Sequence, residues 1–145
     1  MGDPKTFDSS RFLDAQAPVL ETVMAELSAG RKQSHWMWFI FPQLRGLGLS
    51  PMSLHYSLAS VEEAQSYLGH AELGLRLVDC TGLLLSIEGR SLRQIFGSPD
   101  DRKFQSCMTL FSLAAPDERG AIFRQALDQY CGGRLDHRTL EILSL

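Results

Sequence analysis

The sequence has few cysteines, and their positions give them no shared chemical role. Cys80, Cys107 and Cys131 are odd in number and far apart, without a Cys-x-x-Cys pair or a Cys/His cluster. A zinc site is therefore not expected, and we interpret all three as reduced, buried thiols. A Cys107–histidine nucleophile is the weaker alternative, because Cys107 lies inside an apolar helical pattern.

The chain also lacks a long apolar run. Its apolar segments are well short of the roughly 18–20 residues that cross a bilayer. Residues 1–5 have neither the basic start nor the apolar core of a signal peptide. We therefore expect a cytoplasmic protein that makes no contact with a membrane.

An excess of cations is missing as well. The formal net charge of −3 argues against general affinity for a nucleic-acid backbone, which requires a basic surface. Binding through Arg31, Lys32, Arg45 and Arg76 remains the third-ranked hypothesis. No set of His, Asp and Glu has metal-ligand spacing, and Gly46-Leu47-Gly48 lacks the third glycine of a dinucleotide motif. We expect neither a metal nor a cofactor.

No alternating pattern of a β-strand occurs, whereas helix start and stop signals recur along the chain. Val19 to Leu27 follows the spacing of an amphipathic helix that ends at Gly30, with Glu21 and Glu26 on the wet side. Further helices are predicted to begin at the caps Ser50, Ser60, Ser91, Ser98 and Asp136.

The longest predicted helix covers residues 71–87 and is expected to be central. Gly74 and Gly82 lie inside it, and each costs about 1 kcal/mol relative to alanine, so close packing against a neighbour should compensate. The whole pattern predicts an all-α fold. We expect one compact, orthogonal multi-helical domain of about seven or eight short helices over residues 1–145, with 1–7 as an arm.

Residues 31–48 are the densest part of the sequence, with both tryptophans, two further aromatics and three cations. Ser34 is predicted to cap one to two buried helical turns, and a buried strand is the alternative. On a helix, Trp38 and Phe41 would lie near one face and Trp36 near another. One face can then fill the core while the other lines a groove.

Several segments together resemble the signatures of the DUF1810 family. They are residues 31–44, 46–50, 95–103, 108–111 and 132–136, which include His35-Trp36-Met37-Trp38 and Phe96-Gly97-Ser98-Pro99. The resemblance spans nearly the whole chain. It implies a compact all-helical protein of bacterial type, and it supplies neither an assigned function nor catalytic residues.

The polar residues beside the aromatic run are the candidate site. His35 is the candidate acid or base, and Asp100 could orient it from another helix; the simpler interpretation is a histidine that fixes a helix start. Arginine and lysine suit carboxylate or phosphate, and tryptophan can stack on a base. The predicted ligand-binding residues are Lys32, Gln33, Ser34, His35, Trp36, Gln43, Arg45 and Lys103.

Two functions from different classes fit these residues. The first is a site that binds, or acts on, a small anionic ligand of nucleotide type, in a cleft beside residues 31–48. The second is a protein-interaction or dimerisation module in which the aromatic stretch is purely structural. The sequence does not decide between binding and catalysis, or between a monomer and a homodimer.

Overall fold

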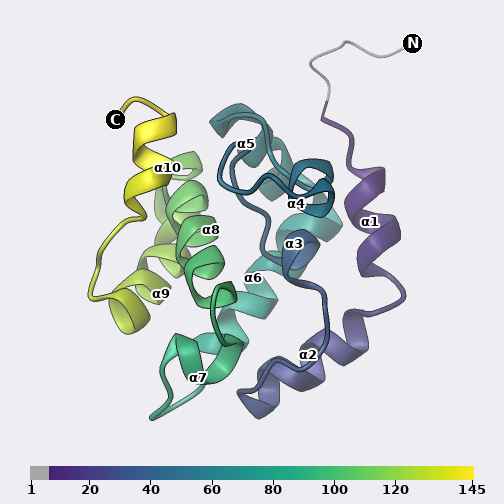
Figure 1. Cartoon of the computed structure of the whole chain (residues 1–145), viewed down its shortest axis with the longest axis vertical. Helices are drawn as coiled ribbons and strands as arrows, with labels where there is room; N and C mark the ends of the chain where they lie inside the picture. Colours follow the sequence, from purple (N-terminus) through teal and green to yellow (C-terminus); the bar gives the residue numbers. More distant parts are fainter. Residues whose placement is uncertain (1–6) are drawn as a thin grey trace.

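The computed structural model describes residues 7–145, which form ten α-helices, one 3-10 helix and no strand (Figure 1). The predicted all-α fold is confirmed, but the expected number of helices is too low because several one-turn segments are separate helices. The elements are α1 (Ser10–Gln16), α2 (Leu20–Ala29), α3 (Met37–Ile40), α4 (Pro51–His55), α5 (Val61–Gly69), α6 (Ala71–Leu85), α7 (Leu92–Phe96), α8 (Asp100–Ala114), η1 (Glu118–Gly120), α9 (Ala121–Cys131) and α10 (His137–Ile142).

The predicted N-terminal arm lies mostly outside the described residues. Its last residue, Phe7, packs on the core: its ring lies 5.9 Å from Phe12 and 6.1 Å from Tyr67, between centroids. None of the helices within residues 7–145 is both long enough and apolar enough to cross a membrane.

The central helix is α8, with α5, α7, α9 and α10 packed around it (Figure 1). Nine of its fifteen residues are buried, against six of fifteen in α6, so the helix predicted to be central is the less buried of the two. The reason is that α8 is surrounded along its length, whereas α6 packs against α2, α5 and α9 and keeps one face exposed. The first turn of α8 reaches the surface beside residues 31–48.

The two glycines of α6 have different surroundings. A Cβ on Gly74 would lie 2.0 Å from the carbonyl oxygen of Leu68, so the expected close approach is present there. A Cβ on Gly82 would meet only Ile122, at an ordinary 3.9 Å. The prediction that close packing explains both glycines therefore holds for Gly74 alone.

Two predicted caps are wrong because their serines are placed elsewhere. Ser34 precedes α3, but the N-cap is Trp36 and makes no side-chain cap, while the Ser34 hydroxyl donates to Glu26. Ser98 lies before Pro99, which itself occupies the N-cap of α8 without a side-chain hydrogen bond. The remaining predicted caps at Ser50, Ser60, Ser91 and Asp136 all accept the expected backbone amide.

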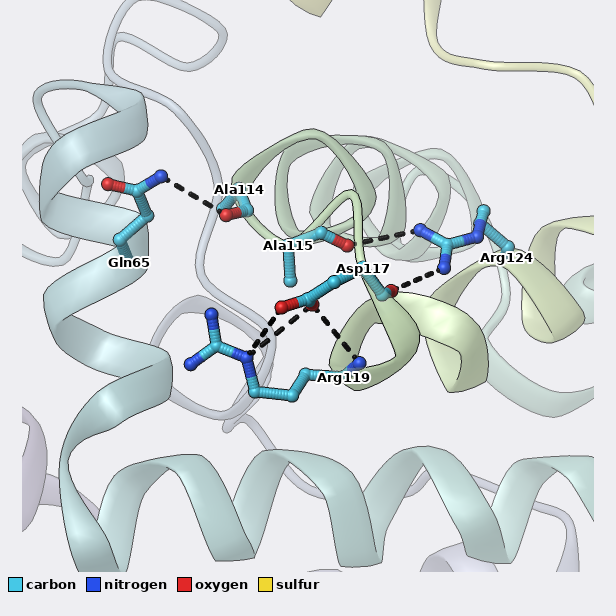
Figure 2. A network of polar contacts seen from close by, with 6 residues as sticks. All are labelled: Gln65, Ala114, Ala115, Asp117, Arg119 and Arg124. Carbon is cyan, nitrogen blue, oxygen red and sulfur yellow. Dashed lines mark hydrogen bonds and ion pairs between the residues drawn. The ribbon is translucent and has the colours of Figure 1, made fainter.

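A polar network fixes the far end of α8, where the chain turns through η1 into α9 (Figure 2). The Arg124 guanidinium donates to the carbonyl oxygens of Ala115 at 3.1 Å and Asp117 at 2.6 Å. The Gln65 amide donates to the carbonyl oxygen of Ala114 at 3.2 Å. The donors to Ala114 and Ala115 satisfy carbonyls that the end of α8 leaves without intrahelical partners. We therefore assign this network a structural role.

Candidate functional site

The Glu26 carboxylate organises the start of the aromatic stretch. Its oxygens accept hydrogen bonds from the backbone amides of Gln33 at 2.8 Å and Ser34 at 3.0 Å. They also accept from the Ser34 hydroxyl at 2.5 Å and the Trp36 indole nitrogen at 2.9 Å. The predicted place of Glu26 on the wet side of α2 is therefore wrong, because four donors from the following loop surround the carboxylate.

These hydrogen bonds keep Glu26 ionised. Burial raises the pKa of the carboxyl, but the Ser34 hydroxyl, the amides of Gln33 and Ser34 and the Trp36 indole together lower it to about 2. A carboxylate that accepts several N–H and O–H donors is stabilised in its charged form. Gln33 and Ser34, predicted to bind a ligand, are thus engaged by Glu26 through their amides.

The two tryptophans have different exposure. Trp36 is 1% exposed and lies near Phe41 and Phe96, so its ring offers no surface for the predicted stacking on a ligand. Trp38 is half-buried, and the Lys103 ammonium nitrogen lies 5.3 Å from the centroid of its ring. The cation and the ring are within the distance of a cation–π contact.

Asp100 joins two lysines at the start of α8. One carboxylate oxygen lies 3.0 Å from the Lys32 ammonium nitrogen and the other lies 3.3 Å from that of Lys103. The Lys32 side chain is only 8% exposed and also lies over the Trp36 ring. Lys32 is therefore a structural cation in this arrangement. Within residues 7–145 no ion pair or hydrogen bond joins Asp100 to His35, which is exposed, so the predicted His35–Asp100 pair is not formed.

Arg45 is engaged by the segment that precedes α5. Its guanidinium donates to the Ser57 hydroxyl at 3.1 Å, and its backbone amide donates to the Leu58 carbonyl at 2.7 Å. Leu44 and Leu58 form an isolated parallel bridge that holds the chain here. Gly46 follows with a φ of 104°, which favours glycine, and turns the chain back toward α8.

A cavity of about 310 Å³ lies where the glycine loop, residues 46–48, faces the first two turns of α8. Of the eight predicted ligand-binding residues it brings together two, Gln43 and Lys103, and Gly48 of the loop lines the same cavity. Its wall does not include the other six predicted residues, which are Lys32, Gln33, Ser34, His35, Trp36 and Arg45. The other lining residues are Leu47, Ser53, Pro99, Arg102, Ser106, Asp136 and Arg138.

The charge of this cavity is positive on an acidic chain. Arg102, Lys103 and Arg138 are cations and Asp136 is the one acid in the wall, which leaves a formal charge of +2. The Asp136 carboxylate accepts hydrogen bonds from the amide and hydroxyl of Thr139, as the cap of α10. In the described part of the chain neither Arg102 nor Arg138 forms an ion pair.

Sequence reasoning missed Arg102 and Arg138. Arg102 lies in a segment whose sequence pattern indicates only the start of a helix. Arg138 lies in the last helix, 36 residues further along the chain. The usable signal was the Asp136 cap, which fixes the first turn of α10 and so the place of Arg138. The proximity of Arg138 to Lys103 depends on the tertiary packing of α10 on α8.

The cysteines take no part in the cavity. All three are buried and free, as predicted. Burial raises the pKa of Cys80 to about 12 and that of Cys107 well above its ordinary value. Both thiols are therefore neutral near pH 7, and a neutral thiol is a poor nucleophile.

Comparison with known proteins agrees with the fold. A family model described as "Protein of unknown function (DUF1810)" matches residues 6–143. The crystal structure of the conserved hypothetical protein Rv1873 from Mycobacterium tuberculosis is 52% identical in sequence, superposes with a TM-score of 0.93 and is matched over 99% of both chains. No curated protein matches the chain. Since the family model covers nearly all of the sequence, the chain belongs to the DUF1810 family of proteins of unknown function.

Proposed function

We propose that the protein binds a small anionic ligand of nucleotide type in the cavity between the glycine loop and α8. The observation that carries the proposal is the convergence of Arg102, Lys103 and Arg138 on one cavity of an acidic chain. Two of these cations have no acidic partner among the described residues. A bound anion would supply that partner, because guanidinium groups pair well with phosphate and carboxylate.

The wall also suits a ligand with an uncharged part. Leu47 and Pro99 provide apolar surface, while the Gln43 amide can donate to and accept from a base or sugar. Gly48 lets the loop approach closely, since a Cβ there would lie 2.6 Å from the Ser53 hydroxyl oxygen. A volume of about 310 Å³ is at the lower end of small-molecule sites.

The proposal is one of binding, with no chemical step assigned. The one buried hydroxyl in the wall, that of Ser106, donates to the carbonyl oxygen of Arg102 at 3.0 Å. No general base is within hydrogen-bonding contact of it among the described residues. A nucleophilic serine would need such a base.

A thermal-shift screen tests this function. Nucleoside mono-, di- and triphosphates are compared with the matching uncharged nucleosides at constant ionic strength. At a hundredfold excess over Kd a specific ligand raises Tm by roughly 5–10 °C. A shift with at least one phosphorylated member, and a smaller one with its nucleoside, is the expected result. Equal shifts for both, or none in the series, would refute the proposal.

The alternative function is a dimerisation or protein-interaction module. It is favoured by Leu49, Met52 and Leu54, which are 83%, 40% and 45% exposed beside the glycine loop. Exposed apolar residues that gather on one surface are typical of interfaces. Analytical ultracentrifugation of the wild type and of Leu54→Ser distinguishes this function from ligand binding. A dimer that the substitution weakens supports the dimerisation module. A monomer at every concentration up to several hundred micromolar would contradict dimerisation.

A further inference from the structure

A second cationic cavity lies on the other side of Arg102. Its volume is about 300 Å³, and it is formed by the start of α7, the outer face of α8 and the end of α9 with the turn that follows. Three arginines from these three segments line it: Arg93, Arg102 and Arg134. Asp101 is the single acid in its wall, so the formal charge of the lining is +2.

The three guanidinium groups are not used by the fold. Within residues 7–145 none of them forms an ion pair or a side-chain hydrogen bond, although Asp101 lines the same cavity. The Asp101 carboxylate instead accepts from the backbone amide of Arg102 at 2.9 Å. Three like charges around one small space repel one another, and an anion between them would relieve that repulsion.

Two other polar side chains of the wall donate to backbone carbonyls and hold it in place. The Gln105 amide donates to the carbonyl oxygen of Arg134 at 3.0 Å, which ties the turn after α9 to α8. The Tyr130 hydroxyl donates to the carbonyl of Leu84. The charged donors of the wall are the arginines, whose side chains are exposed and make no hydrogen bond to the rest of the described chain.

The charges also lie close to Cys131, which lines the same wall. Burial raises the pKa of Cys131 to about 11; the Arg134 cation lowers it in part and the Asp101 carboxylate raises it. The thiol is thus neutral near pH 7 and does not make the cavity a nucleophilic site. What remains is a set of donors suited to an oxyanion.

We propose that this second cavity binds the phosphoryl group of a soluble phosphorylated molecule. A planar guanidinium offers two parallel N–H donors to phosphate oxygens, and three of them match a dianion with three terminal oxygens. The small volume and the acidic chain favour a small molecule over a nucleic acid, which needs an extended basic surface. The inference stands apart from the proposed function, although Arg102 lines both cavities.

Side-chain NMR of the full chain tests the inference with inorganic phosphate as the probe. Phosphate is titrated at constant ionic strength, with chloride replacement as the control for screening. We expect saturable shifts of the Nε–H signals of Arg93, Arg102 and Arg134 with one dissociation constant. Arg93→Gln and Arg134→Gln, which touch only this cavity, should each weaken binding about tenfold, the usual effect of losing a hydrogen bond to a charged group.

Three control variants separate this cavity from the first. Lys103 and Arg138 line only the first cavity, so Lys103→Gln and Arg138→Gln should keep the phosphate affinity within twofold of the wild-type value. The same is expected of Arg119→Gln, at the far end of α8 (Figure 2). Circular dichroism of each variant checks that it is folded. The inference is overturned if chloride reproduces the shifts, if all arginine variants act alike, or if only an oligonucleotide binds. A failure of nucleotides to bind the first cavity would not contradict the inference about the second cavity.

Discussion

At the residue scale, one carboxylate, that of Glu26, holds the start of the aromatic stretch against α2. Glu26 follows the pattern of an exposed helix position, yet its carboxylate gathers four donors from residues 33–36. No local signal predicts this, because the donors include two backbone amides that become neighbours only when the loop folds back on α2. The same contacts explain why Ser34 does not cap α3.

Glu26→Gln should lower the free energy of unfolding by about 2 kcal/mol, because the four donors lose a charged acceptor. Glu21→Gln is the matched control on the same helix; Glu21 is exposed, and we expect a change within about 0.5 kcal/mol. Urea denaturation followed by tryptophan fluorescence measures both. Equal stability of the two variants would show that the cluster contributes nothing.

The same carboxyl predicts a pH dependence. Its pKa falls from an ordinary 4.5 to about 2 on folding, so the unfolded chain binds the proton more tightly. The stabilisation is fully present above pH 4.5 and is lost as the pH falls through 2. We expect the stability difference between wild type and Glu26→Gln to shrink over this range. A difference independent of pH would contradict the assignment.

At the element scale, the sequence predicts the helices where local chemistry decides them. Ser50, Ser60, Ser91 and Asp136 cap the expected helices because a cap needs only a neighbouring amide. Prediction fails where tertiary contacts compete, as at Ser34. It also overestimates the burial of α6: the run of three leucines at 83–85 favours a deeply buried helix, but only Leu84 is fully buried there.

The glycines of α6 provide a matched test of packing. Gly82→Ala should raise the stability by about 0.5–1 kcal/mol, since alanine favours a helix and its Cβ meets only an ordinary contact. Gly74→Ala should lower it by roughly 3 kcal/mol, because the Cβ would collide with the Leu68 carbonyl and force α5 and α6 apart. Thermal unfolding measures both; changes of the same sign would contradict this account.

The ion pairs at the start of α8 test how that helix is attached to the segment after α2. Asp100→Asn leaves the Lys32 ammonium buried without its partner and should cost about 2–3 kcal/mol. Asp101→Asn removes the same charge from the same helical turn without touching Lys32, and we expect a cost below about 1 kcal/mol. Chemical denaturation compares them, and an equal cost would show that the lysine contact adds nothing.

At the scale of the whole molecule, the site was predictable only in part. The glycine loop and the start of α8 do meet, and Gln43 and Lys103 do line a cavity there. His35, Trp36 and Arg45 do not line it: His35 is exposed outside this wall, Trp36 is buried in the core, and the Arg45 guanidinium donates to the Ser57 hydroxyl. Arg138 enters the site through the docking of α10, which sequence spacing does not reveal.

The most direct test of the central claim is calorimetric titration of the nucleotide that gives the largest thermal shift. Lys103→Gln and Arg138→Gln should each raise its Kd about tenfold, since each removes a charged donor from the cavity. Arg119→Gln removes the same charge beyond the opposite end of α8, roughly 20 Å away by helix rise, and should leave Kd within twofold. Equal affinity in all three variants, or no measurable binding by the wild type, would contradict the claim.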